Sequence, residues 1–268
     1  MTANTKQQSE ILDKVYALIT MHQNGALGGE VMPEDANPHL AKGCAENYLY
    51  FTLPMALNYQ RNSYMLWESA LQTYCDEGTR FVFHPAICLT KTFAEVQCAL
   101  TQYKVALQKQ KQTEIWLSLC HTFMALFDGD IRKLFAMCHN DVDEIRNFVQ
   151  IQNKKRFPYL SGTKICNYWL YVIHQYTDRT YQNIGSLTVA PDTHVCKATH
   201  RLGLISDAEF ASGNVQQIVI NRWQELLQNT GYNPIDVHTP LWLWSRNGFP
   251  ALLPNLSSAH ASSKALHA

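Results

Sequence analysis

The sequence predicts an all-α protein, and three observations support this. Apolar residues recur every three or four positions along most of the chain, as at Ile11, Val15 and Leu18, which is the spacing of one buried helix face. No run of β-branched residues alternates with polar ones over the length of a strand, so a large sheet is not expected. At 268 residues, 46% of them hydrophobic, the chain can bury a substantial core as one large domain or as two closely packed lobes.

In the N-terminal half, the first helix is expected around 11–19, before a connection rich in Gly, Pro and Asn at 24–38. Two helices, at 48–57 and 64–74, are separated by the polar break Asn58–Asn62. The helical spacing then continues through three further stretches, at 93–107, 115–127 and 142–151.

The C-terminal half continues the helical spacing, with helices expected at 164–176, 193–202, 215–229 and 236–246. The segments near 24–43 and 186–192 are the best candidates for places where the chain crosses between two lobes. We assign 1–250 to one domain of two lobes. Residues 251–268 are mostly small and polar and predict a disordered tail.

Charge and cysteine usage set broad limits on function. The 22 basic and 22 acidic residues cancel, so the overall charge gives no support for a nucleic-acid partner. A local basic patch can still bind phosphate, because electrostatic attraction is short-ranged at physiological salt. The eight cysteines form no CxxC and no regular framework, which favours a reducing, cytosolic compartment. We find no signal peptide and no apolar run long enough to span a bilayer.

Metal and cofactor motifs are absent from the sequence. Cys120 and Cys138 each precede a histidine, but adjacent side chains on a helix point in different directions. The cysteine spacing of a C-terminal iron–sulfur cluster is missing, as are the P-loop, GxGxxG, GxSxG and HExxH motifs. We therefore expect no metal, no cofactor and no iron–sulfur cluster.

The segment Leu160–Lys164 fits a hairpin between two helices. Gly162 permits a sharp turn, and the exposed amides of Gly162 and Thr163 at the start of the next helix favour a phosphate oxygen. The densest basic cluster of the chain lies around this turn and comprises Lys154, Lys155, Arg156, Lys164 and Lys197. The alternative is a plain helix–helix turn with a solvated basic face, which is the more frequent meaning of such a turn taken alone.

Lys164 and Asp192 are the candidate catalytic residues. The Lys164 amine could attack a sugar carbon and form a Schiff base, if burial or neighbouring cations lower its pKa. Asp192 could stabilise a positively charged sugar or activate a nucleophile from the start of the 193–202 helix. The alternatives are a surface lysine and a plain helix N-cap.

Aromatic residues could form a pocket for a planar base. Trp67 and Trp242 could stack on it, and a polar neighbour would be needed for selectivity. His238 precedes Trp242 by four residues, which puts both on one helix face. Core packing is the alternative for all of the tryptophans, and we prefer it for Trp169 and Trp223. Gln60 could wedge into a duplex, or it could belong to a solvated turn between helices.

Taken together, these motifs resemble the helix-hairpin-helix superfamily of DNA glycosylases, and within it the archaeal 8-oxoguanine DNA glycosylases most closely. The likeness is good over about 157–247 and faint over 44–75. The segments that carry it are Pro158–Lys164 with the following Ile165–Tyr168, Pro191–Ile205 (PDTHVCKATHRLGLI), and Asp236–Leu243 with Arg246; Asn58–Gln60 and Trp67–Glu68 are weaker matches.

The resemblance implies a two-lobed helical fold with a cleft between the lobes and a helix-hairpin-helix motif near 157–166. It implies excision of a flipped, damaged purine, which could be an oxidised one, by cleavage of its N-glycosidic bond. Asp192 matches the catalytic aspartate of the family. A lysine Schiff base could add cleavage of the strand at the abasic site, with the nucleophile at Lys164 in one branch of the family and near Lys154 and Lys155 in the archaeal branch. The archaeal pattern has an acidic residue where this chain has His238.

The expected partner is therefore double-stranded DNA with a damaged base, bound by a monomer that is intracellular and associated with the nucleoid. Gly162, Thr163, Lys154, Lys155, Arg156, Lys197 and Gln60 are the expected DNA contacts. Two alternatives stay open. The protein could be a non-catalytic DNA-binding protein that retains the fold, or a helical protein without a nucleic-acid partner in which Asp192 is only a cap.

Overall fold

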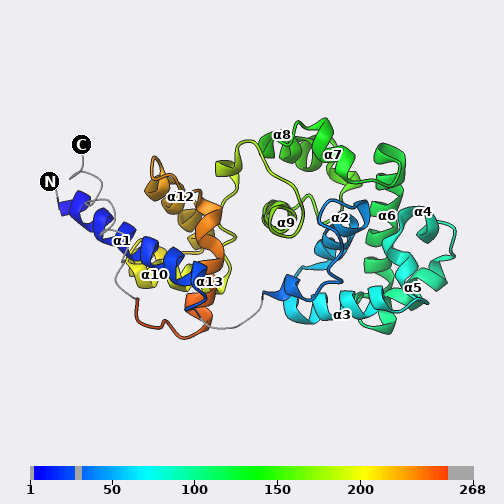
Figure 1. Ribbon diagram of the computed structural model, residues 1–268, viewed down its shortest axis with the longest axis horizontal. Helices are drawn as coiled ribbons and strands as arrows, with labels where there is room; N and C mark the ends of the chain where they lie inside the picture. Colours follow the sequence, from blue (N-terminus) through cyan, green and yellow to red (C-terminus); the bar gives the residue numbers. More distant parts are fainter. Residues whose placement is uncertain (1–2, 28–31, 253–268) are drawn as a thin grey trace, which may run out of the picture. The chain divides into compact units, whose positions relative to one another are not determined.

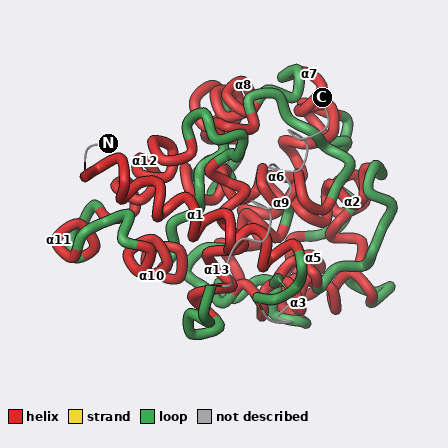
Figure 2. Tube along the Cα trace, turned by 60° about the vertical axis from the view of Figure 1, so that its left-hand side comes forward, coloured by secondary structure: helices red, strands yellow, loops and turns green. Residues whose placement is uncertain are grey.

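The computed structural model describes residues 3–27 and 32–252, with side chains from residue 6 onward. Every regular element in these ranges is a helix, and one isolated β-bridge joins Asp141 and Gln182 (Figures 1 and 2). The prediction of an all-α protein is confirmed. None of the described helices is both long enough and apolar enough to cross a membrane.

The chain divides into two compact units. Among the described residues, unit 1 consists of 3–27 and 187–252, and unit 2 is the continuous stretch 32–186. Both divisions fall inside the segments 24–43 and 186–192, which the sequence marks as crossings.

Unit 1 combines helices from both ends of the chain. Its elements are α1 (Ala3–Gln23), α10 (Thr193–Leu202), α11 (Asp207–Phe210), α12 (Val215–Leu227), η7 (Pro234–Val237) and α13 (His238–Arg246). α13 is the central helix, because both α1 and α10 pack against it. Trp223 of α12 is fully buried and donates its indole N–H to Thr199 Oγ1 at 2.9 Å.

Unit 2 contains the remaining helices. They are η1 (Pro33–Asp35), α2 (Ala45–Thr52), η2 (Pro54–Leu57), α3 (Ser63–Cys75), η3 (Arg80–Phe83), α4 (Pro85–Cys88), α5 (Phe93–Gln102), α6 (Lys109–Phe127), α7 (Arg132–Met137), α8 (Val142–Arg146), the π-helical turn η4 (Asn147–Gln152), η5 (Lys154–Arg156), α9 (Thr163–Tyr176) and η6 (Ile184–Ser186). α9 lies beside α2 and is seen end-on in Figure 1.

Aromatic side chains fill the core of unit 2. Tyr50 and Phe83 stack with ring centroids 5.5 Å apart, and Trp116 donates its indole N–H to the Val82 carbonyl at 2.8 Å. Trp169 of α9 is fully buried and bonds Thr52 Oγ1 at 3.0 Å. The core assignment of Trp169, like that of Trp223, is therefore confirmed. Each such side chain stabilises the fold by about 1.5–3 kcal/mol through burial.

Several helix boundaries differ from the prediction. The expected helix 48–57 is divided into α2 and η2 at Pro54, which has no N–H for an α-helical hydrogen bond. The expected helix 93–107 ends at Gln102, and α6 begins at Lys109 rather than 115. The short helices α4, α7 and α11 were not expected. The predicted tail lies outside the described residues from 253 onward.

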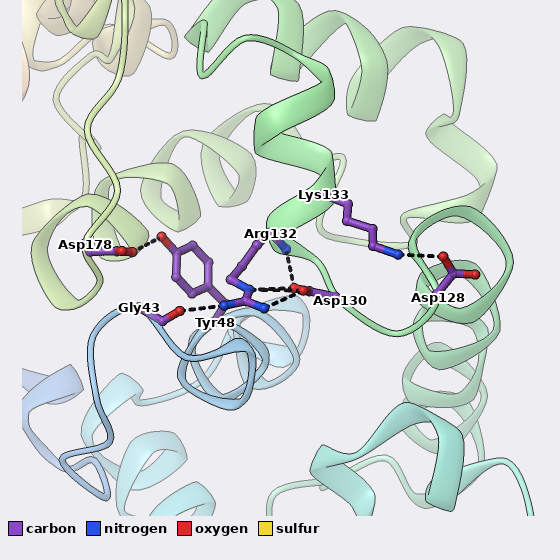
Figure 3. Close-up of polar contacts among 7 residues, drawn as sticks. All are labelled: Gly43, Tyr48, Asp128, Asp130, Arg132, Lys133 and Asp178. Atoms are coloured by element: carbon purple, nitrogen blue, oxygen red, sulfur yellow. Dashed lines mark hydrogen bonds and ion pairs between the residues drawn. The ribbon is translucent and has the colours of Figure 1, made fainter.

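A group of polar contacts, which we call the clasp, joins three loops of unit 2 (Figure 3). Arg132 forms a bidentate pair with Asp130, with its shortest N–O distance at 2.6 Å, and donates to the Gly43 carbonyl at 2.7 Å. Tyr48 donates to Asp178 Oδ1 at 2.5 Å. A Cβ added at Gly43 would lie 2.8 Å from Asp178 Oδ2, so a larger residue there would displace the carboxylate to which Tyr48 donates.

Candidate nucleic-acid interface

The predicted hairpin is a tight turn that leads into α9. Phe157 and Leu160 are fully buried and anchor it. The Gly162 N–H donates to the Tyr159 carbonyl at 2.9 Å, and a Cβ at Gly162 would lie 3.1 Å from that oxygen. No side chain caps α9, whose first hydrogen bond runs from the Cys166 N–H to the Gly162 carbonyl at 2.8 Å. The Gly162 amide is therefore engaged within the turn, contrary to the expectation that it is free for a phosphate. The next amides, from Thr163 to Ile165, lie at the helix N-terminus, where an anion is favoured.

The basic turn η5 is held through its main chain. Thr122 Oγ1 donates to the Arg156 carbonyl at 2.8 Å, and Ser161 Oγ donates to the Lys154 carbonyl at 3.3 Å. The side chains of Lys154, Lys155 and Arg156 are all exposed. The fold therefore fixes the backbone of this turn and leaves three cationic groups in solvent, as a phosphate-binding role requires.

Lys164 lies in the first turn of α9 and is exposed, as is Thr163. Its ammonium group makes no hydrogen bond or ion pair with the described part of the chain. An amine nucleophile is usually activated by burial or by an adjacent cation. The exposed Lys164 can reach a ligand, but burial does not activate its amine in this structure.

Asp192 is the N-cap of α10, as one of the two sequence hypotheses predicts. Its Oδ1 accepts the Val195 N–H at 2.9 Å, and its Oδ2 accepts the Trp242 indole N–H at 3.0 Å. The side chain is half-buried. Both oxygens are thus held in a fixed orientation, one by the helix that Asp192 starts and the other by α13.

α13 holds the segment before α10 at a second point. The His238 Nδ1 accepts the Ala190 N–H at 3.3 Å, and His238 is buried like Trp242. Arg246 lies over the Trp242 ring, 5.1 Å from its centroid, and the His194 ring packs on Trp242 in an edge-to-face arrangement with ring centroids 5.5 Å apart. The predicted shared face of His238 and Trp242 therefore packs against the 190–194 segment. The sequence did not indicate the bond from Trp242 to Asp192.

Trp67 is fully enclosed in unit 2, with the rings of Tyr50 and Phe51 at 5.8 and 5.6 Å. Its indole N–H completes no hydrogen bond among the described residues. The nearby Glu34, in η1, is 1% exposed, and both of its oxygens lie 3.2 Å from the Tyr168 hydroxyl. Burial raises the pKa of the Glu34 carboxyl to about 7, while Tyr168 and Trp67 act in the opposite direction.

Glu34 is not among the functional residues that the sequence predicts. It stands in a connection rich in Gly, Pro and Asn, where a carboxylate is normally solvated. A possible signal was Pro33 directly before it, since proline favours the first position of a short helical turn. The packing of η1 against α3, together with Tyr168 of α9, removes the carboxyl group from water.

The loop 58–62 contains Gln60, which is exposed and has a backbone φ of 49°. Arg61 ties this loop to the next one by donating to the Val105 carbonyl at 2.6 Å and the Lys104 carbonyl at 3.1 Å. Tyr59 is 51% exposed and packs against Tyr159 of the hairpin, with ring centroids 5.6 Å apart. Gln60 and the hairpin therefore belong to neighbouring loops of unit 2.

The predicted site residues fall into two groups. Unit 2 carries Gln60, Trp67, Lys154, Lys155, Arg156, Gly162, Thr163 and Lys164, and unit 1 carries Asp192, Lys197, His238 and Trp242. Lys197 is exposed on α10, so its contribution to the basic cluster around the hairpin stays a prediction. The pairing of Lys164 with Asp192, and of Trp67 with Trp242, also stays a prediction.

The described residues include no group of three or more His, Cys, Asp or Glu side chains that could hold a metal ion. All eight cysteines are free thiols. Cys88 and Cys120 are buried neighbours, and their contact together with burial raises the pKa of the Cys120 thiol. These thiols pack as small apolar groups.

The chain matches no protein-family model and no curated protein sequence.

Proposed function

We propose that this protein is a DNA base-excision glycosylase of the helix-hairpin-helix type, acting on double-stranded DNA with a damaged purine. The observation that carries the proposal is the fixed carboxylate of Asp192. It stands at the start of α10, at the position where the resemblance puts the catalytic aspartate, and accepts hydrogen bonds from Val195 and Trp242. A carboxylate that accepts from two donors is oriented before any substrate arrives.

In the proposed reaction, the N-glycosidic bond breaks and the base departs with its bonding electron pair. Positive charge then develops on the sugar. Asp192 stabilises this charge or takes a proton from the attacking water. The start of a helix also favours a negative group, so the position supports a carboxylate in this role.

As base-binding residues we propose Trp67 of unit 2, with the buried Glu34 as its polar neighbour, and His238 and Trp242 of unit 1. A tryptophan ring stacks on any base, whereas a carboxyl group distinguishes bases by the N–H donors at their edges. The indole N–H of Trp67 and the buried Glu34 carboxyl beside it place a donor and a hydrogen-bonding carboxyl together. Because Trp67 is fully enclosed, base entry requires side chains around it to move.

Strand cleavage would require a lysine. Lys164 and the pair Lys154–Lys155 are all exposed, so we propose both positions as candidates for the nucleophile. Borohydride reduces a Schiff base to a stable amine and thereby traps the lysine on DNA. Trapping that survives Lys164→Ala but is lost in the Lys154→Ala, Lys155→Ala double variant would assign the nucleophile to the archaeal register.

The test of the glycosylase is release of bases from duplexes that each carry one lesion. We expect Asp192→Asn to lower the single-turnover rate by at least about 100-fold. Asparagine retains the N-cap but loses the acceptor for Trp242, so Trp242→Phe separates the loss of that bond from the loss of charge. Asp207→Asn, an exposed carboxylate of the same unit, is the matched control. Full activity of Asp192→Asn would refute the mechanism.

The second candidate is a DNA-binding protein without catalysis. The exposed, unburied Lys164 and the zero net charge of the chain favour it. Duplex binding with no turnover of any lesion, by protein whose thermal unfolding shows it to be folded, would support this candidate.

A further inference from the structure

Three segments of unit 2 meet at the Tyr159 side chain in the hairpin. The ring of Tyr59 lies 5.6 Å away, and the ammonium group of Lys111 lies 5.2 Å from the Tyr159 ring centroid. Lys111 belongs to the first turn of α6, and Arg61 joins the Tyr59 loop to the segment that precedes α6. The hairpin, the loop 58–62 and the segment 104–111 are therefore contiguous.

The stretches of sequence around these segments contain basic residues but no acidic ones. No Asp or Glu occurs in 50–67, 104–113 or 147–177. Their cationic residues, which we call the basic face, are Arg61, Lys104, Lys109, Lys111, Lys154, Lys155, Arg156 and Lys164. Within the described part of the chain, none of them forms an ion pair. The global balance of charge thus hides a local excess of positive charge.

The lysines of α6 stand at the end of the helix where positive charge is electrostatically unfavourable. Lys109 and Lys111 lie in its first turn, which contains no acidic residue. Cations are unfavourable at this end of a helix because the free amides already carry partial positive charge. Lys164 has the same unfavourable place in α9. A positive charge that costs the fold stability points to a ligand that carries negative charge.

The backbone beneath the basic face is held in place before any ligand binds. The N–H groups of Leu107 and Gln108 both donate to Gln112 Oε1, at 2.5 and 3.0 Å. Each of the three segments also contains one residue other than glycine with a left-handed backbone, namely Gln60, Lys104 and Tyr159. Such conformations persist only where surrounding contacts impose them.

We propose that Lys104, Lys109 and Lys111 form a second row of phosphate contacts, so that unit 2 binds the backbone of duplex DNA through the start of α6 as well as through the hairpin. Tyr159 is the positioning residue that joins the two rows. The choice of DNA as the partner rests on the proposed function. The contacts are to the backbone, so binding does not require a lesion.

The experiment is fluorescence anisotropy of an undamaged duplex over a series of salt concentrations. We expect the double variant Lys109→Gln, Lys111→Gln to bind more weakly and to reduce the salt slope by about 0.9 for each phosphate that the protein no longer neutralises. The matched control is Lys91→Gln, Lys133→Gln, which removes two lysines of the same unit outside the basic face and should leave the slope unchanged. Thermal unfolding should show that neither variant is less stable than its parent by more than a few degrees.

Tyr159 is tested in the same assay. Tyr159→Phe keeps the ring contacts and should retain the salt slope, whereas Tyr159→Ala should lower affinity without removing a charge. Loss of binding in Tyr159→Ala together with an unchanged double lysine variant would restrict binding to the hairpin and overturn the second row.

The outcomes separate this inference from the glycosylase. An unchanged salt slope in Lys109→Gln, Lys111→Gln, or no duplex binding by the parent protein, overturns the inference even if lesions are excised. Tighter binding of duplex RNA than of duplex DNA overturns the choice of partner. Normal duplex binding with no excision of any lesion overturns the proposed function and leaves this inference standing.

Discussion

The clasp and the basic face use the same residue types within unit 2 in opposite ways. In the clasp, Arg132 is neutralised by Asp130 and Tyr48 donates to Asp178. On the basic face, Tyr59 is half-exposed and Lys111 has an aromatic ring but no carboxylate as its partner. The presence or absence of a carboxylate partner, rather than the residue type, therefore distinguishes cations that stabilise the fold from cations that are available to a ligand.

Glu34 is a buried carboxyl group with no cationic partner among the described residues, unlike Asp130 in the clasp. Its titration should give the largest change in the free energy of unfolding. Its pKa in the folded protein, about 7, lies above the ordinary value of 4.5, so the folded state holds the proton more tightly than the unfolded state. The contribution of protonated Glu34 to the free energy of unfolding is therefore fully present below pH 4.5. It is lost as the pH rises through about 7, by about 3 kcal/mol at most.

Urea denaturation at about pH 5 and about pH 8 tests this expectation. Glu34→Gln, which carries no titratable proton, should be close to the parent at the lower pH and more stable at the higher pH. Glu77→Gln, at an exposed position, is the control and should follow the parent. A parent whose stability relative to Glu34→Gln does not change with pH would contradict the raised pKa.

The tyrosines of the two regions should respond differently to loss of the hydroxyl. Tyr48→Phe removes the bond to Asp178 and a 3.2 Å bond from Arg179 Nε, and should cost about 1–3 kcal/mol because charged partners are involved. Tyr59→Phe should change the free energy of unfolding by less than about 0.5 kcal/mol. Equal changes in the free energy of unfolding in the two variants would contradict the difference that we infer between the clasp and the basic face.

The smallest effect is expected for single lysines. Lys109→Gln should stabilise the protein by about 0.3–1 kcal/mol at low salt, because it removes a cation from the start of α6. Lys133→Gln removes an exposed ion pair with Asp128 and should cost no more than about 1 kcal/mol. Both effects should shrink at high salt. Destabilisation by Lys109→Gln would mean that this lysine supports the fold.

The sequence was sufficient for the fold class and for elements with a clear periodic pattern. The helix expected from 164 begins at Thr163, and Asp192 caps α10 as the sequence allowed. The segment 104–107 was wrongly included in a helix because Val105, Ala106 and Leu107 extend the apolar pattern. In the structure that helix ends at Gln102, and Lys104 adopts a left-handed backbone, which sequence periodicity does not show.

The site depended more on tertiary contacts, which local patterns do not record. Trp242 lies 50 positions from the aspartate to which it donates, and no spacing rule connects them. Glu34 becomes a buried carboxyl only where Trp67 and Tyr168, from two distant helices, close around it. Sequence reasoning therefore named the chemical groups but could not supply the partners that orient them.

The discontinuity of unit 1 has a consequence for how the chain folds as it is made. Unit 2 is continuous in sequence, whereas α1 of unit 1 packs on α13, which is synthesised more than 200 residues later. The apolar side chains Ile11, Val15 and Leu18 are buried in the finished protein, so during synthesis they must wait for their partner. The same delay applies to the Asp192 carboxylate, which acquires its indole donor only after Trp242 has been added.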